Sequence, residues 1–240
     1  MHITSWFHSV EEKDKTQVIR TIVEHGTPDF DYHYMLTISS LMAIMGILLD
    51  NVTIIIGAML VAPIMHPVLG VALGVAIARF SVIKRSLSVL IKSLFFSLSL
   101  GAFVAFIFHM FYDKTYTNEL LAYSDASLPY FFVAVIAGAA IAYVLAKPEW
   151  NSALPGIAVS VAFVPPTAST AVGIALFDIS IILGGAGLLL ANLLGIASAA
   201  AVVFTLMDFK KKGAIAERVL SSEAKKLRHE QEVISRLNKK

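Results

Sequence analysis

The sequence GAMLVAPIMHPVLGVALG runs from Gly57 to Gly74, in the middle of an apolar segment long enough to cross a membrane. Proline lacks the amide hydrogen that a helix uses, and its ring clashes with the preceding turn, so a helix ends or kinks there. Proline also disfavours helical geometry in the residue before it. Pro63 and Pro67, with His66 between them, therefore predict a broken helix.

The apolar character extends far beyond this stretch. Of the 240 residues, 57% are hydrophobic and 15% are charged, whereas a soluble domain carries nearer a quarter charged residues. Because an apolar run of about 20 residues crosses a bilayer as a helix, we expect an all-α polytopic membrane protein. The second and fifth of its candidate spans are interrupted: 33–49, 51–79, 88–112, 129–146, 151–177 and 180–207.

The distribution of charge predicts that both interrupted segments cross the membrane. Cytoplasmic loops carry an excess of Lys and Arg, and three lysines at 210–212 directly follow the last span. If both interrupted segments cross, the basic stretch 79–92 lies on the same side as the tails, and the acidic loop 113–125 lies outside. If neither crosses, these loops exchange sides and contradict the rule. We therefore expect about six crossings with both termini in the cytoplasm.

An internal repeat relates the two interrupted segments. A shift of 99 residues lays GAMLVAPIMHPVLGVALGVAIA, which starts at Gly57, over GIAVSVAFVPPTASTAVGIALF, which starts at Gly156. This shift aligns Pro67 with Pro166, and each half then reads as a span, a broken span and a span. Three crossings per half invert the second half relative to the first, as in many secondary transporters. The two predicted repeats cover about 33–112 and 129–207.

Two inverted breaks can converge on a polar chamber at the middle of the membrane. Lipid cannot solvate the backbone groups that a break frees, so these groups must face protein or water. Half-helices ending at the chamber direct carbonyls into it, and half-helices beginning there direct amides. A single proline kink usually serves packing alone, but two matched breaks favour a binding site. The residues predicted to bind substrate are His66, Pro63, Pro67, Pro165, Pro166, Thr167, Ser169, Thr170 and Asn192.

Two of these residues have a structural alternative of about equal weight. His66 either lines the chamber or bonds a carbonyl that the break has freed. Asn192 lies deep in the last span, where an unpaired amide is costly, so it either lines the chamber or clamps neighbouring helices. Small-residue pairs starting at Gly138 and Gly195 also permit close approach of helices.

The segments GAMLVAPIMHPVLG and PGIAVSVAFVPPTAS resemble the paired signatures of a widespread prokaryotic membrane family of unknown function, labelled "uncharacterised hydrophobic protein". The resemblance covers about residues 33–207 and implies a multi-pass protein of the prokaryotic cytoplasmic (inner) membrane. It also implies that Asn192, within LLLANLLGIAS, is a motif position. The family more often has glycine at the position of His66, which argues against a general role for this histidine. The resemblance supplies no substrate.

Amphipathic helices are expected on both sides of a transmembrane domain at 33–209. One is a cytoplasmic helix within 1–32, and the other is a basic cytoplasmic helix within 210–240. In the second helix, apolar residues recur every seven positions at Leu220, Leu227 and Ile234. This spacing fits a homo-oligomer that assembles through the helix and equally fits a solvated amphipathic helix.

The leading hypothesis is a transporter of a small solute or ion whose site lies between the two breaks. Helix amide ends, together with Thr167, Ser169 and Thr170, favour a small anion, and the choice of coupling ion, Na⁺ or H⁺, stays open. The alternatives are an oligomeric ion channel, since broken helices also form filters, and a scaffold that binds a partner without transport.

An enzyme is not expected. The sequence contains no Walker A loop, no nucleotide fingerprint and no metal-spaced pair of His and acidic residues. No cofactor, metal or nucleic acid is expected either. The expected partners are the lipid bilayer, a small solute or ion, and a second copy of the chain.

Overall fold

The computed structural model describes residues 12–112, 116–146 and 154–237, and these residues form helices and connecting turns with no strand among them. The apolar core falls into two clusters, one around α2, α5, α8 and α10 and the other around α3, α4 and α9. The helices are α2 (Glu12–His25), α3 (Phe30–Leu48), α4 (Val52–Val61), α5 (Met65–Ala76), α6 (Phe80–Phe111), α7 (Asn118–Ala122), α8 (Leu128–Leu145), α9 (Leu154–Leu176), α10 (Ile179–Leu206), the 3-10 helix η2 (Phe209–Lys212) and α11 (Gly213–Leu237).

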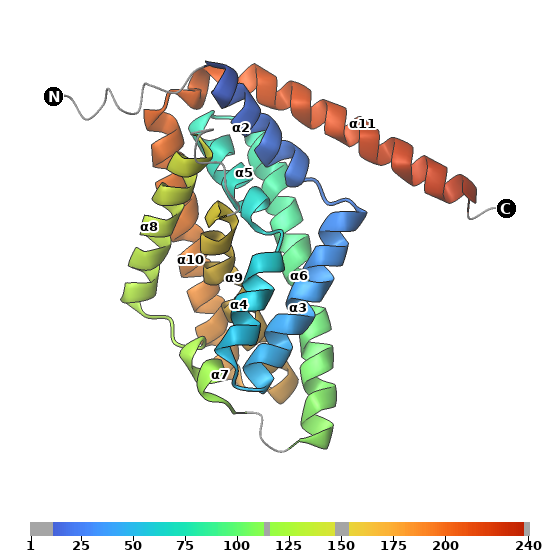
Figure 1. Cartoon of the computed structure of the whole chain (residues 1–240), viewed down its shortest axis with the longest axis vertical. Helices are drawn as coiled ribbons and strands as arrows, with labels where there is room; N and C mark the ends of the chain where they lie inside the picture. Colours follow the sequence, from blue (N-terminus) through green and yellow to red (C-terminus); the bar gives the residue numbers. More distant parts are fainter. Residues whose placement is uncertain (1–11, 113–115, 147–153, 238–240) are drawn as a thin grey trace.

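The bundle has two distinct ends (Figure 1). At one end, Thr117 Oγ1 donates to Ile47 O at 2.8 Å, which holds α7 against the end of α3. At the other end, Arg79, which precedes α6, pairs with Glu217 of α11 at 3.3 Å. We call these the α7 end and the tail end. The helices α3, α6, α8, α9 and α10, and the α4–α5 pair, each run between the two ends.

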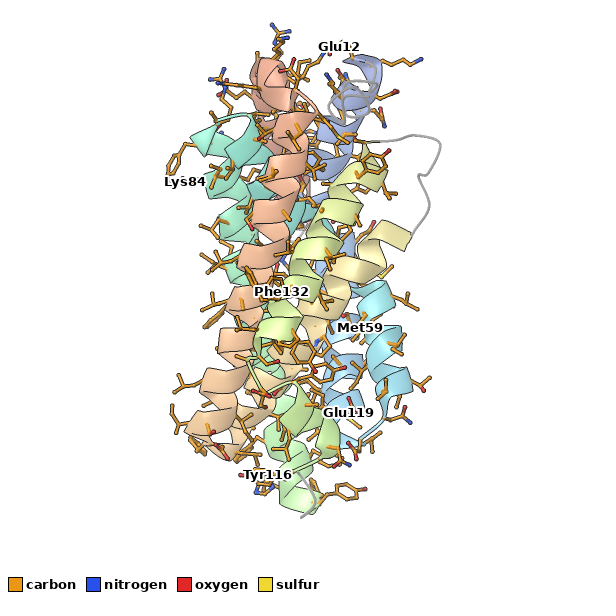
Figure 2. The ribbon with its side chains drawn as sticks, turned by 90° about the vertical axis from the view of Figure 1, so that its left-hand side faces the viewer. Glu12, Met59, Lys84, Tyr116, Glu119 and Phe132 are labelled. Atoms are coloured by element: carbon orange, nitrogen blue, oxygen red, sulfur yellow. The ribbon has the colours of Figure 1, made fainter. Side chains whose placement is uncertain are left out.

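Several helices have the length and composition of membrane spans. The helices α6, α8 and α10 qualify alone, and the bent α4–α5 pair adds a fourth candidate. Large apolar side chains on the outside of α6 and α8 are exposed, including Phe95 at 73% and Phe132 at 61% (Figure 2). These features support a multi-pass membrane protein. The expected spans match the helices closely, except that α6 begins at Phe80 instead of at residue 88.

The predicted break in the first half is confirmed. α4 ends at Val61, α5 begins at Met65, and the two helices are bent by 57°. Pro63 lies in the non-helical link, where its missing amide interrupts no helix. Pro67 lies in the first turn of α5, where amides have no partner within the helix, so it is tolerated there.

The predicted break in the second half is wrong, because α9 continues as one helix through Pro165 and Pro166. Pro166 cannot donate to the carbonyl of Ala162, one helical turn earlier. Asn192 Nδ2 of α10 donates to that same carbonyl at 2.7 Å. The side-chain amide thus replaces the missing backbone donor, and the helix passes the prolines without ending. Within the described residues, a proline-broken helix is therefore present in the first half only.

A single type of turn joins three of the helix pairs in the described structure: α3–α4, α5–α6 and α9–α10. In each, the residue before the helix cap has a left-handed φ of 52°, 54° or 55°, at Asp50, Ala78 and Phe177 respectively. The next amide donates to the carbonyl of a glycine in the first helix, at 2.9, 2.9 and 3.0 Å. A side chain at these glycines would collide with the second helix of the pair. The glycines are Gly46, Gly74 and Gly173. The last two are related by the 99-residue shift found in the sequence.

The two tail helices pack against each other and against the tail end of the bundle. α2 contacts α5 and α11. It buries one apolar face, formed by Val18, Ile19, Ile22 and Val23. The carboxylate of Glu12 joins α2 to the chain after α10, because it contacts Lys212 Nζ at 2.8 Å and Lys15 Nζ at 3.0 Å. These two lysines, Lys212 more than Lys15, lower the pKa of Glu12 to about 2.

Acidification is expected to loosen the docking of α2. Since the pKa of Glu12 is lowered from 4.5 in the folded protein, its contribution is fully present above pH 4.5 and is lost as the pH falls toward 2. Amide protection of α2, measured by hydrogen exchange and corrected for intrinsic rates, should fall between pH 6 and pH 3. In a Glu12→Gln variant this decrease should be much smaller. A decrease of the same size in the variant would assign it to other groups.

Candidate functional site

Three cavities contain most of the residues that the sequence marks as a site. One opens toward the α7 end and one toward the tail end, and a much smaller one lies between α3, α6 and α9. Their volumes are about 210, 470 and 20 Å³ in that order. We call them the α7-end cavity, the tail-end cavity and the small cavity.

The α7-end cavity lies where α7, α8, α9 and α10 meet. Its floor and walls are mostly apolar, with polar side chains at its mouth and at its inner end. The lining consists of Glu119, Ala122 and Tyr123 from α7 and its cap, Tyr130, Val133, Ala134 and Ala137 from α8, Ala162 and Pro166 from α9, and Leu188 and Asn192 from α10.

Asn192 is the polar group at the inner end of this cavity, and it is 4% exposed. Its Nδ2 donates to Ala162 O, while its Oδ1 is buried and has no hydrogen-bond partner. The carbonyl of Ala162 requires a donor, and this fixes which end of the amide faces α9. Asn192 therefore clamps two helices through its nitrogen, while its oxygen is enclosed by the surrounding protein.

Acidic and phenolic groups surround the mouth of the same cavity. The backbone amide of Glu119 donates to Asp50 Oδ1 at 3.0 Å, which leaves the Glu119 carboxylate at the cavity wall. Partial burial raises the pKa of Glu119, and the nearby charge of Asp50 raises it further. Burial also raises the pKa of Tyr123, and the nearby Glu119 and Tyr130 raise it further. Two acidic residues, Glu119 and Asp50, thus lie at or near this mouth.

The tail-end cavity contains the first-half site residues, His66 and Pro63. The ring of His66 stacks on His25 of α2 with their centroids 5.0 Å apart. The remaining polar lining is more acidic than basic: Glu24, Thr27, Asp29, Asp31, Tyr32, Glu223 and Lys226. His66 therefore faces the tail helices and shares no cavity with Thr167.

The small cavity is lined by four hydroxyl side chains, all of which are hydrogen-bonded. Ser40 Oγ donates to Ser97 Oγ at 2.9 Å, Ser39 donates to Ala58 O at 2.9 Å, and Thr167 donates to Phe163 O at 2.7 Å. Its volume of about 20 Å³ suits about one water molecule. Its lining residues Leu36 and Ile64 directly follow Met35 and Pro63 of the tail-end cavity.

The other predicted residues lie apart from these cavities. Pro67 and Pro165 are buried in helix packing. Ser169 forms a 2.7 Å hydrogen bond with Ser124 near α7, and Thr170 donates to Pro166 O at 2.7 Å. The nine residues thus do not line one chamber. Pro166 and Asn192 share the α7-end cavity, and Pro63 and His66 share the tail-end cavity.

Sequence reasoning missed the mouth residues Glu119, Tyr123 and Tyr130. They belong to the loop and helix start that were interpreted only as markers of topology. An available signal was the run NELLAY, a short helical stretch that carries an acid between two spans. Within the described residues, no group of three or more His, Asp or Glu side chains is placed to hold a metal ion.

Comparisons with known proteins identify the family but no activity. An uncharacterized protein of Methanocaldococcus jannaschii is 26% identical over 135 residues, which cover 56% of this chain and 41% of the relative. The match therefore spans about two fifths of that relative's length. No solved structure matches the chain. Residues 59–198 match the family described as "Domain of unknown function (DUF389)". This range begins within α4, contains the α4–α5 link and extends past Asn192. Since this match covers more than half of the 240 residues, the chain belongs to the DUF389 family.

Proposed function

We propose that this protein is a membrane transporter of a small solute and that its pathway includes the α7-end and tail-end cavities. The observation that carries the proposal is a cavity of about 210 Å³ whose lining includes the buried polar residue Asn192. Asn192 lies at the middle of α10, about 20 Å along the helix from either end. A polar group at this depth, facing a cavity, is a typical substrate contact in a membrane protein.

In this proposal α3, the α4–α5 pair, α6, α8, α9 and α10 cross the membrane, and both tails lie in the cytoplasm. The positions of the basic residues support this orientation. Arg79 contacts α11, Arg85 donates to Leu220 O and to Thr27 Oγ1, and Lys84 lies at the same end (Figure 2). Cytoplasmic ends of membrane helices are enriched in such residues. The matching turns at a spacing of 99 residues support the inverted repeat.

The two large cavities enter from opposite ends and suit a transporter that opens to one side at a time. α9 forms a continuous wall between the α7-end cavity, which it lines with Ala162 and Pro166, and the small cavity, which it lines with Thr167. The α4–α5 bend lies beside the tail-end cavity through Pro63. Discontinuous helices of this kind form the substrate sites in many secondary transporters.

The side chains favour a neutral or cationic solute over the small anion expected from the sequence. The anion preference rested on amide ends at two breaks, but α9 has no break. The hydroxyls of Thr167 and Thr170 donate to carbonyls of their own helix. The lining of the α7-end cavity includes the acidic residue Glu119 and, among the described residues, no Lys, Arg or His.

The proposal is tested by uptake into proteoliposomes from a mixture of small labelled solutes, including organic acids, neutral amino acids and amines. Since the chain has no cysteine, single-cysteine variants label cleanly. Ala137 lines the α7-end cavity, and its neighbour Ile136 is 69% exposed on the outside of α8. We expect saturable uptake of at least one solute. Modification of an Ala137→Cys variant with a charged methanethiosulfonate should block this uptake, and modification of Ile136→Cys should leave it unchanged.

Two results would overturn the proposal. The first is no uptake of any solute above protein-free liposomes, which is the expectation for a scaffold. The second is large unitary currents without saturation or counterflow, which would make the protein a channel. Equal block at both cysteine positions would remove the α7-end cavity from the pathway.

A further inference from the structure

We infer that α2 is a latch over the start of α5, that Arg85 of α6 keeps this latch closed, and that the latch must lift for the tail-end cavity to open. A latch here means a helix that can move away while the rest of the bundle stays folded. Its effect on transport rests on the proposed function. The movement itself requires no substrate, so it is tested separately.

The helix α2 covers the part of α5 that directly follows the bend. It lies across the first turns of α5 at the tail end of the bundle (Figure 1). The ring of His25 stacks on His66, which lies in the first turn of α5. One turn further along α5, a Cβ built at Gly70 would lie 3.7 Å from Cγ2 of Ile22. The apolar face of α2 therefore packs directly on this part of α5.

A single guanidinium group holds both tails against the bundle. Arg85 Nη2 donates to Thr27 Oγ1 at 2.9 Å, and Arg85 Nη1 donates to Leu220 O of α11 at 3.0 Å. Thr27 is buried just after the end of α2, and its own hydroxyl hydrogen is donated to Val23 O at 2.9 Å. Its oxygen thus links Arg85 to the last turns of α2. Hydrogen bonds with a charged donor are roughly twice as strong as neutral ones.

The hydrogen bond from Arg85 to Thr27 also spans the bent link. The shared turn joins α3 to α4 and α5 to α6, so a change in the 57° bend between α4 and α5 moves one helix pair relative to the other. Thr27 precedes α3, and Arg85 lies in α6. Neutral hydroxyl pairs, such as Tyr32 with Ser93 at 2.8 Å, connect the same helix pairs more weakly. The charged hydrogen bond therefore opposes a change in the bend.

The elements that Arg85 holds also form walls of the tail-end cavity. Pro63 lines this cavity at the bend, Thr27 lines it after α2, and Glu223 lines it from α11. Release of Arg85 frees the contacts of α2 and α11 with α6 together. The two tail helices can then move away from the bend, which widens the cavity.

The rate at which a water-soluble maleimide labels a His66→Cys variant measures how often the latch lifts. The chain has no other cysteine, and α2 covers this position. Adding Arg85→Gln should raise the rate at least about tenfold, because two charge-assisted hydrogen bonds are lost. Adding Arg85→Lys should also raise it, since lysine keeps the charge but lacks the planar fork that reaches both acceptors. An unchanged rate with either substitution would overturn the inference.

Two controls separate a lifted latch from a loosened bundle. Arg79→Gln in the His66→Cys protein removes the exposed ion pair with Glu217 at the same end, and it should leave the labelling rate within about twofold. Labelling of Ala137→Cys in the α7-end cavity should change by less than about twofold when Arg85→Gln is added. Equal acceleration at Ala137→Cys would mean that the whole bundle has loosened, and this would overturn the inference.

A reversible cross-link tests the consequence for transport. A Cβ built at Gly26 lies 3.7 Å from Cβ of His66, a separation that suits a disulfide. The pair Gly26→Cys and His66→Cys should therefore join α2 to α5 on oxidation. The same Cβ would lie 2.6 Å from Ile22 O, so the reduced form of the same protein is the reference. We expect oxidation to block solute uptake and reduction to restore it.

The outcomes distinguish this inference from the proposed function. Full uptake by the cross-linked protein would overturn the latch and leave the transporter proposal standing. Faster labelling with Arg85→Gln, without uptake of any solute by the unmodified chain, would support the latch and overturn the transporter proposal.

Discussion

Replacing Asn192 by leucine is expected to destabilise the protein by about 2 kcal/mol, because the carbonyl of Ala162 then loses its donor inside the helix bundle. This carbonyl needs the side-chain amide only because Pro166 cannot supply one. In a Pro166→Ala background, the alanine donates its own backbone N–H to Ala162 O. The same Asn192→Leu replacement should then cost about 1–2 kcal/mol less. Reversible chemical unfolding of the four proteins in detergent measures this coupling.

A matched control for this cycle is Ser198→Ala on the same helix. Ser198 Oγ donates to Gly195 O of its own helix at 3.1 Å, so its loss leaves α9 untouched. Its effect is expected to be about 0.5 kcal/mol or less and to be the same with either residue at position 166. If Asn192→Leu and Pro166→Ala had strictly additive effects on the free energy of unfolding, Asn192 would not compensate for the missing donor of Pro166.

Substituting alanine for Gly138 is expected to cost about 3 kcal/mol or to prevent folding, since the helices α8 and α10 touch at this point. A methyl group there would lie 2.5 Å from the carbonyl oxygen of Ile196 and 2.6 Å from its Cα. These are backbone atoms, so the whole helix must move to make room, and overpacking of this kind is destabilising. Thermal unfolding, followed by the loss of the monodisperse peak in size-exclusion chromatography, measures the effect.

Gly187→Ala in α10 is the matched control for Gly138→Ala. A methyl group at Gly187 would meet only the Cβ of Ala126 at 3.4 Å, which is an ordinary contact. Its expected effect is within about 0.5 kcal/mol. Similar stabilities for the two alanine variants would mean that α8 and α10 separate easily at Gly138. The small-residue pair in the sequence indicated a close helix approach at Gly138, within the chain or between subunits, and the structure shows this approach against α10.

The helices could be predicted from the sequence because their signals are local. Apolar length defines the spans, and Pro63 marks the break between α4 and α5. The second break was predicted wrongly because its compensation is not local. Asn192 lies 30 residues along the chain from Ala162, whose carbonyl accepts its hydrogen bond. The sequence around Pro165 and Pro166 therefore gives no sign of this donor. Asn192 clamps α9 and α10 through its Nδ2, and it lines the α7-end cavity instead of a chamber between two breaks.

The candidate site was harder to predict because it depends on how α7 packs against the end of α3 and the turn that follows it. Hydropathy marks the loop around Glu119 as polar and nothing more. Its place at the cavity mouth follows from tertiary hydrogen bonds, namely Thr117 to Ile47 O and the Glu119 amide to Asp50. Likewise, His66 and Thr167 lie only two positions apart when the repeats are aligned, but α2 covers one and α9 turns the other toward α3 and α6.

The turn shared by three helix pairs has a mechanical consequence. In each of these pairs the glycine contact and the amide hydrogen bond leave no space for the two helices to slide or splay. The α5–α6 and α9–α10 hairpins are therefore expected to be stiff, because a change in the angle between their helices would break the hydrogen bond and the packing at the turn. The α4–α5 link, bent by 57° around Pro63, has no such joint. We therefore expect the bundle to bend more easily at the α4–α5 link than at these three turns.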